Sequence, residues 1–206
     1  MASSVANTTS SKRRRLLLLL AAAVALTILA PPPVSALRRR AVHLTVYVQE
    51  ILDGPGQTEK LLIKGPGPAN PSLWPPHNYL GDTIVMDDLV TEAVANNSKP
   101  IGRVYGIYMT ASMTRPVYTV SFTLHLTAGP YNGSTLVMGG IDDSSAVREH
   151  AVVGGTGALR GAQGYVLAVV KPVSPTYVVM ELTVNATVPV PTTKAKAAAS
   201  HLIIDM

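Results

Sequence analysis

Cysteine is absent from the 206 residues of this chain. Its absence excludes disulfide bonds, cysteine-bound zinc, iron–sulfur clusters and a cysteine nucleophile. Charged residues are scarce as well, at 14% of the chain against about 25% in an average soluble domain. A chain that is 47% hydrophobic and so poor in charge is typical neither of a disordered protein nor of a coiled coil. Its length suits one domain of ordinary size.

Motifs of several common functional classes are missing too. The chain has no Gly-X-Ser-X-Gly motif, so an α/β-hydrolase is not supported. No two of its five histidines have the spacing of paired metal ligands, and we expect neither a metal site nor a cofactor. The glycine-rich stretch 154–157 lacks the Gly-Lys-Ser/Thr of a nucleotide-binding loop, and it is read as a tight turn.

The net charge of +5 resembles that of a nucleic-acid-binding protein, but its distribution argues against one. Seven basic residues lie in the two runs Lys12–Arg15 and Arg38–Arg40, and no acidic residue precedes Glu50. Between Ala41 and Val190 there are eight Lys or Arg and eleven Asp or Glu, which makes this region slightly acidic. We therefore expect no nucleic-acid partner.

The N-terminal basic run begins the layout of a secretory signal peptide. It precedes fifteen residues, Leu16–Ala30, that are apolar or small apart from one Thr, and then Pro31–Pro33 and the small residues 34–36. The apolar run is shorter than the about 20 residues of a transmembrane helix. We expect a signal peptide at 1–36, a folded domain at 37–190, a loosely ordered tail at 191–206, and a secreted protein without membrane attachment. An uncleaved signal anchor is the alternative.

Three Asn-X-Ser/Thr sequons follow the predicted cleavage point, at Asn96, Asn132 and Asn185. Such sequons are acceptors for N-glycosylation in secreted proteins. Asn132 lies in a Pro-Tyr-Asn-Gly turn, and Asn185 lies on the polar face of a predicted strand. We expect glycans at these positions.

Most of the mature region alternates apolar and polar residues with a period of two. The alternation is strict over 117–127 and 177–187 and typical of strands with two unlike faces. Further strands are predicted at 43–51, 83–87, 101–112, 134–139, 149–153 and 164–171, whereas 54–76 is rich in Gly and Pro and is read as a long loop. The pattern predicts an all-β domain. Its long strands, and the scarcity of the Cys and Trp residues that anchor an immunoglobulin sandwich, favour a barrel.

Two groups of charged residues lie on or beside predicted strands. Glu50 shares a strand face with Leu44, Val46 and Val48. If this face is buried, the pKa of Glu50 is raised and the residue suits a general acid; otherwise it ends the strand and reaches water. The second group contains Asp142, Asp143 and Arg148, where Arg148 either pairs with an interior carboxylate or lies on the surface.

Five ordered blocks together resemble the plant dirigent protein family, over about residues 43–188. The blocks are Gly81–Glu92 (GDTIVMDDLVTE), Ile101–Tyr108 (IGRVYGIY), Tyr131–Leu136 (YNGSTL), Val147–Gly157 with its Val-Arg-Glu and Gly-Gly-Thr-Gly, and Arg160–Tyr165 (RGAQGY). Five blocks in the same order and at compatible spacing are far more specific than any one of them.

The resemblance implies an eight-stranded antiparallel β-barrel of the dirigent and allene oxide cyclase type, which forms a homo-oligomer (trimer or dimer) in the apoplast. A barrel of eight strands can hold one small ligand. Family members bind monolignol radicals, such as those of coniferyl alcohol, that a separate laccase or peroxidase produces, and direct their stereoselective coupling in lignan and phenylpropanoid biosynthesis. Radical coupling has little barrier, so such a protein acts by orientation and needs no oxidase activity or cofactor of its own.

The resemblance also assigns roles to residues of this chain. Glu50 matches the family's first-strand acid, which is usually Asp after His, whereas here Gln49 precedes it. Asp142 and Arg148 match interior charged residues, and Tyr108 matches an interior substrate-binding tyrosine. We expect Glu50, Asp142 and Arg148 to be catalytic. The alternatives are a quinone-methide cyclase or isomerase that uses an interior carboxylic acid, and a non-catalytic phenolic-binding protein of plant defence.

Overall fold

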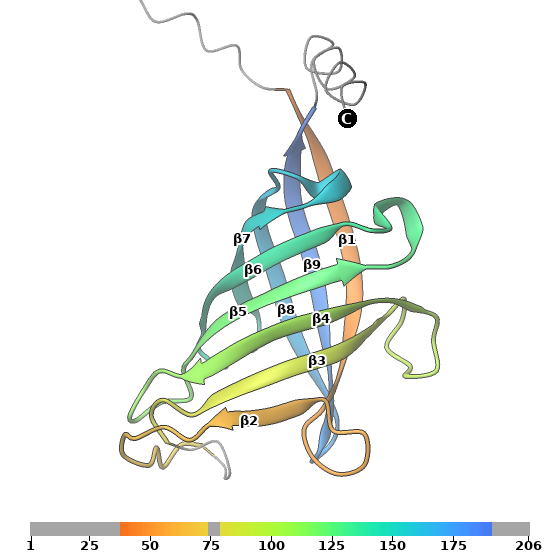
Figure 1. Cartoon of the computed structure of the whole chain (residues 1–206). Coiled ribbons are helices and arrows are strands. Elements are labelled where there is room, and N and C mark those ends of the chain that lie inside the picture. Colours follow the sequence, from red (N-terminus) through yellow and green to blue (C-terminus); the bar gives the residue numbers. More distant parts are fainter. Residues whose placement is uncertain (1–37, 74–78, 191–206) are drawn as a thin grey trace, which may run out of the picture. The chain divides into compact units, whose positions relative to one another are not determined.

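The computed structural model describes residues 38–73 and 79–190 (Figure 1). The predicted signal peptide and the predicted C-terminal tail lie outside the described residues. Within them, the helical segments are two single turns of 3-10 helix, Gly129–Tyr131 and Gly157–Leu159, and neither is long enough to cross a membrane. The strands are β1 (Arg39–Ile51), β2 (Glu59–Ile63), β3 (Thr83–Thr91), β4 (Pro100–Thr110), β5 (Tyr118–Leu126), β6 (Thr135–Asp142), β7 (Arg148–Gly155), β8 (Gln163–Ser174) and β9 (Tyr177–Pro189).

These strands form a closed antiparallel barrel. Neighbours follow the order β1-β9-β8-β7-β6-β5-β4-β3, and β1 also pairs with β3 to close the ring (Figure 1). The eight strands of the ring are joined by hairpins except where β2 and its loops separate β1 from β3. The predicted all-β class and the eight-stranded antiparallel barrel are therefore confirmed.

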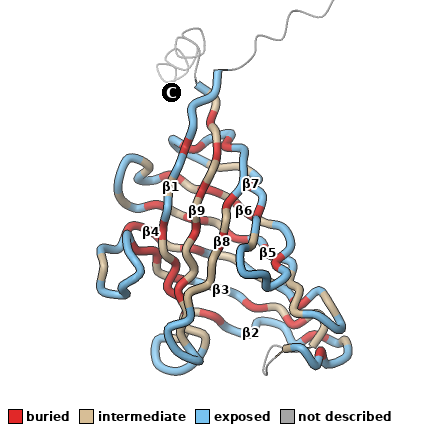
Figure 2. Tube along the Cα trace, turned by 180° about the vertical axis from the view of Figure 1, so that it is seen from behind, coloured by how far each residue is buried: buried red, intermediate tan, exposed pale blue. Residues whose placement is uncertain are grey.

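The core lies on the inner face of the barrel. Along the strands, buried positions alternate with exposed or half-buried ones (Figure 2), as expected for a sheet with one face turned away from water. Alternate residues of the strand predicted at 117–127 are buried, namely Val120, Phe122, Leu124 and Leu126. Burying each such side chain stabilises the fold by about 1.5–3 kcal/mol.

One predicted loop is wrong in part. Residues 54–76 contain β2, which pairs with the edge of β3 through Glu59 opposite Met86 and Lys60 opposite Val85. Glu59 is buried, but the other four residues of β2 are exposed, so the strand carries no alternation that a sequence pattern could reveal. The predicted turn at 154–157 is also displaced, because Gly154 and Gly155 belong to β7 and the turn follows them.

The edge of β3 is shared between two strands. Residues 83–86 of β3 pair with β2, whereas residues 89–91 pair with β1. We call this divergence of β1 and β2 the fork. Backbone bonds hold it together: the Thr58 amide donates to the Ile51 carbonyl at 3.0 Å, and the Asp87 amide donates to the Thr58 carbonyl at 3.1 Å.

Candidate functional site

The barrel encloses a cavity of about 270 Å³, which we call the lumen. Its lining is mainly aliphatic and aromatic, and the polar residues in it are Glu50, Glu59, Tyr108, Tyr118, Asp142, Ser144, Arg148 and His150. All four residues that the sequence assigned to catalysis or substrate binding, namely Glu50, Tyr108, Asp142 and Arg148, are in this lining. The structure thus brings them to one cavity, while their chemical roles stay predictions.

Asp142 and Arg148 form an ion pair at the lumen. The Arg148 guanidinium donates from Nη1 to Asp142 Oδ2 at 3.1 Å, and the side chains are only 18% and 9% exposed. The other carboxylate oxygen accepts the Ser144 backbone amide at 2.8 Å. Ser144 has a positive φ of 59°, which turns the backbone back toward the carboxylate. Asp143 is exposed, so Asp142 is the interior member of the predicted pair.

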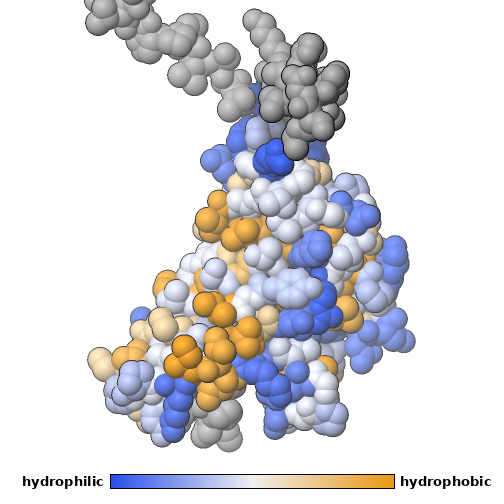
Figure 3. Space-filling model, in the orientation of Figure 1, coloured by the Kyte–Doolittle hydropathy of each residue, from blue (hydrophilic) through white to orange (hydrophobic). Residues whose placement is uncertain are grey.

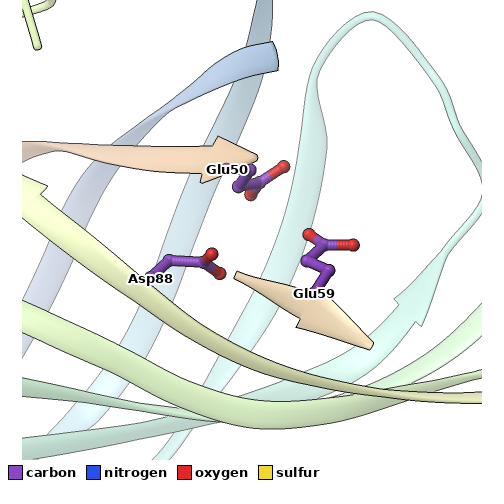
Figure 4. Close-up of side chains that lie close together, drawn as sticks. All are labelled: Glu50, Glu59 and Asp88. Atoms are coloured by element: carbon purple, nitrogen blue, oxygen red, sulfur yellow. The ribbon is translucent and has the colours of Figure 1, made fainter. Parts of the chain in front are cut away.

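A second polar group consists of three carboxyl groups at the fork, and we call it the carboxyl cluster. Glu50 comes from the end of β1, Glu59 from the start of β2 and Asp88 from β3 (Figure 4). One oxygen of each lies within 4.8 Å of the others, and all three residues are buried. Continuing the register of β1 and β3 by one pair places Glu50 opposite Asp88. The fork therefore brings together acids that are far apart in the sequence.

Gln49 fixes the end of β1 from the other side of the strand. Its side chain is buried and donates from Nε2 to Thr91 Oγ1 at 2.7 Å. Its amide oxygen also accepts a hydrogen bond from the Tyr177 hydroxyl. Because neighbouring side chains of a strand point to opposite faces, anchoring Gln49 directs Glu50 into the lumen.

Burial raises the pKa of every member of the carboxyl cluster. For Glu50 the pKa is raised well above its ordinary value, first by burial and then by the charges of Glu59 and Asp88, while Arg148 opposes the rise. Burial raises the pKa of Glu59, and the hydrogen bond from Tyr108 opposes this. Burial raises the pKa of Asp88 to about 7, against the effect of the Thr58 hydroxyl. These groups therefore hold protons at pH values where exposed carboxyl groups are ionised.

Two tyrosines lie between the ion pair and the carboxyl cluster. Tyr108 donates from its hydroxyl to Glu59 Oε2 at 2.6 Å. Its ring meets the ring of Tyr118 edge to face, with centroids 5.5 Å apart. Burial, and then the charge of Glu59, raises the pKa of Tyr108, so its hydroxyl stays protonated. The pair presents aromatic surface to the lumen, which suits an aromatic ligand.

His150 is a lumenal residue to which the sequence assigned no role. It is 2% exposed and packs edge to face against Phe122 at 5.4 Å between ring centroids. Its Nδ1 has no hydrogen-bond partner among the described residues. Burial lowers its pKa, and the charge of Asp142 opposes this. His150 is therefore a neutral imidazole near neutral pH.

Two members of the carboxyl cluster were missed by sequence reasoning, for different reasons. Asp88 alternates in phase with Ile84, Met86 and Val90, so a predicted strand extended to 91 would have placed it inside. Glu59 gave no such signal, because it lies in the short strand within the predicted loop.

The predicted glycosylation sites lie away from the lumen. Asn96 and Asn132 are exposed. Asn185 is half-buried on the outer face of β9, where its Oδ1 lies 3.1 Å from Nδ1 of His43. Glycosylation of all three stays a prediction.

A protein-family comparison matches residues 41–187 to the dirigent-like proteins. This range covers most of the chain and the whole barrel ring except the ends of β1 and β9. The chain therefore belongs to the dirigent-like protein family.

Individual relatives are similar over the same region. Dirigent protein 1 of Arabidopsis thaliana is 36% identical over 126 residues, which are 61% of this chain and 66% of that protein. Pterocarpan synthase 1 of Glycine max is 34% identical, over 61% of this chain and 66% of that protein. The matched region thus spans slightly less than two thirds of the length of these relatives.

Solved structures agree with the fold. A pterocarpan synthase dirigent protein superposes with a TM-score of 0.65 and 28% identity, covering 76% of this chain and 94% of that one. A second pterocarpan synthase dirigent protein gives a TM-score of 0.64 and 29% identity, covering 74% of this chain and 97% of that one.

Proposed function

We propose that this protein binds one phenolic molecule in the lumen and closes a ring on its quinone methide. The observation that carries this proposal is the buried Glu50, whose raised pKa keeps a proton available at the lumen. A cavity of about 270 Å³ lies near the lower end of ligand pockets, about 300–1,000 Å³, and suits one phenolic better than two. The solved relatives named as pterocarpan synthases support a cyclising role.

The reaction is an isomerisation that needs no oxidant. Glu50 donates its proton to the quinone-methide oxygen as the aromatic ring is restored. A hydroxyl of the same molecule forms a carbon–oxygen bond to the methide carbon and releases its proton. That proton returns to the Glu50 carboxylate, whose raised pKa makes it a stronger base than an ordinary carboxylate, so the acid is restored for the next turnover. The Asp142–Arg148 pair and Tyr108 position the substrate's polar groups.

Chiral analysis of ring-closed products tests this proposal. A quinone methide generated from a hydroxylated phenol is incubated with the protein, and the products are separated by chiral chromatography. We expect one enantiomer in excess, and a loss of about 100-fold or more in rate for Glu50→Gln. The control is Glu149→Gln, which removes an exposed carboxyl group from β7 and should leave the rate unchanged. Equal rates for Glu50→Gln and the wild type would contradict the mechanism.

The apolar part of the lining favours a second candidate function, stereoselective coupling of two monolignol radicals. Coupling requires orientation by the walls and no acid, so residues such as Val104, Phe122 and Met180 would carry it. The test supplies coniferyl alcohol and a laccase or peroxidase as the radical source. A chiral product that persists in Glu50→Gln supports coupling, whereas tight binding with racemic products supports a non-catalytic phenolic-binding protein.

We further place this activity outside the cell, in a glycosylated homo-oligomer. The predicted signal peptide and the exposed sequons Asn96 and Asn132 support secretion and glycosylation. Apolar side chains gather on the outer surface over β3 and β4 (Figure 3), where Val85 and Ile107 are paired neighbours and Met109 is 40% exposed. A second copy of the chain is the occupant that a closed symmetric oligomer would place there.

A further inference from the structure

We propose that Glu50, Glu59 and Asp88 bind one hard divalent cation, of the calcium type, at the fork in the barrel wall (Figure 4). This site goes beyond the proposed function, and its test does not depend on that function. It is built from carboxyl groups alone, and histidine or cysteine spacing therefore gave no indication of it.

Asp88 is the member of the cluster that calls for a ligand. It is fully buried, yet neither of its carboxylate oxygens has a hydrogen-bond partner in the described part of the chain. The Thr58 hydroxyl is near enough to affect its pKa but is not a hydrogen-bond donor of normal geometry. Figure 4 shows its carboxylate directed toward Glu50 and Glu59. A buried, unpartnered carboxylate costs several kcal/mol unless a proton or a cation compensates it.

Side chains of the protein do not supply that cation. Among residues 38–73 and 79–190, the ion pairs are Lys99–Glu92, Arg103–Asp87, Arg148–Asp142 and Lys171–Glu181, and none of them includes a member of the cluster. Arg148 is the basic residue of the lumen lining, and its guanidinium already bonds Asp142. Among the described residues, Tyr108 is the side chain that donates a hydrogen bond of normal geometry to the three acids, which face one another.

The spacing of the oxygens fits a calcium-sized ion. Calcium binds oxygens at about 2.3–2.6 Å, so two oxygens on one ion lie at most about 5 Å apart. The cluster's oxygens lie within 4.8 Å of one another. Magnesium, with shorter bonds of about 2.0–2.1 Å, demands a more regular octahedron than calcium does.

The donor set and the surroundings agree with this choice. An all-oxygen set selects calcium, magnesium or manganese over zinc or copper, which prefer imidazole or thiolate. Glu50 and Glu59 line the lumen, so an ion has a path to the site, and water or a phenol oxygen can complete its coordination. Because a ligating carboxylate must be ionised, the bound cation and the donated proton of Glu50 exclude each other.

Terbium luminescence tests the proposal with the intact protein. Chelator-stripped protein is titrated with Tb³⁺ near neutral pH while its tyrosines are excited, since Tyr108 touches the cluster directly. We expect sensitised emission that saturates at one ion per chain and is displaced by Ca²⁺. Asp88→Asn and Glu59→Gln should weaken binding by at least about tenfold, since even outer-shell losses cost that much. Asp142→Asn is the matched control, since it neutralises a lumenal carboxylate outside the cluster.

Two results of this titration would overturn the cation site. No saturable emission, or equal affinity in the wild type and Asp88→Asn, overturns the proposal and leaves the cluster as a shared-proton site. Weakening by Asp142→Asn as large as that by Asp88→Asn also overturns it, because it would show general attraction of ions to an acidic lumen. Thermal unfolding gives a second measurement: Ca²⁺ should raise the Tm of the wild type but not that of Asp88→Asn or Glu59→Gln.

Discussion

The carboxyl groups at the lumen fall into two groups, one paired with a cationic side chain and one without such a partner. At the ion pair, Asp142 accepts hydrogen bonds from Arg148 and from a backbone amide. In the carboxyl cluster, Glu50, Glu59 and Asp88 contact one another, and among the described residues the Tyr108 hydroxyl donates a hydrogen bond to them. All four residues are buried to a similar degree, so burial does not distinguish them. The difference lies in compensation by a neighbouring charge.

This comparison separates two uses of an interior acid. A carboxylate with a guanidinium and an amide beside it supplies a fixed negative charge that can orient a ligand. Carboxyl groups without such partners gain stability by taking up a proton or a cation, and they can release either one. The same cavity therefore holds a carboxylate paired with a guanidinium and a cluster of carboxyl groups that can take up or release a proton or a cation.

The largest expected effect comes from removing the compensation at the ion pair. Arg148→Met leaves Asp142 buried without its cation and should lower the free energy of unfolding by about 3–5 kcal/mol. Urea denaturation measures it, with the exposed Arg160→Met as control. The double variant Arg148→Met/Asp142→Asn should recover most of the loss. A cost as small as that of Arg160→Met would show that the two situations are not different.

An effect of opposite sign is expected in the cluster. In the folded protein Asp88 has a pKa of about 7, above its ordinary value of 3.8, so the native state holds the proton more tightly than the unfolded chain. The contribution of Asp88 to the stability of the metal-free protein should therefore fall as pH rises from about 4 to about 7 and then level off. Asp88→Asn cannot titrate and should gain up to about 4 kcal/mol over the wild type across this window, since each pKa unit corresponds to about 1.4 kcal/mol.

Urea denaturation at both ends of the window, in chelator, provides the measurement. Glu149→Gln, which removes an exposed carboxyl group, serves as the control and should show no such gain. If Asp88→Asn were equally stabilised at both ends, the proton would not be the compensating group.

The smallest effect concerns the hydrogen bond that Tyr108 donates to the cluster. Tyr108→Phe removes the hydrogen bond to Glu59 and should cost about 1 kcal/mol of stability. It should also raise the pKa of Glu59 further, because this hydrogen bond holds it down. Chemical-shift titration of the Glu59 carboxyl carbon checks this, and Tyr118→Phe is a matched control. An unchanged Glu59 titration would contradict the stated cause.

The sequence drew attention to both residues of the ion pair and to most of the barrel because both depend on local pattern, although it left open whether Arg148 pairs or lies on the surface. Strand alternation revealed β1, β5 and β9, and Asp142 and Arg148 are six positions apart around one turn. The cluster depends on long-range convergence instead. Glu50 was identified by its strand face, but its neighbours come from β2 and β3, and β2 has too little buried surface to leave a pattern. Sequence reasoning therefore named Asp142 together with Arg148, whereas it named Glu50 without Glu59 and Asp88.

The fork also determines how firmly the barrel is closed. Thirteen residue pairs join β1 to β9, from Arg39 opposite Pro189 to Ile51 opposite Tyr177, whereas three pairs join β1 to β3. Local opening of a barrel has the lowest free energy where the fewest backbone hydrogen bonds must break, and here that is between β1 and β3. The carboxyl cluster lies beside this short ladder. When its acids are ionised, their mutual repulsion therefore favours separation of β1 from β3. The ionic state of the cluster therefore changes the free energy of local opening between β1 and β3.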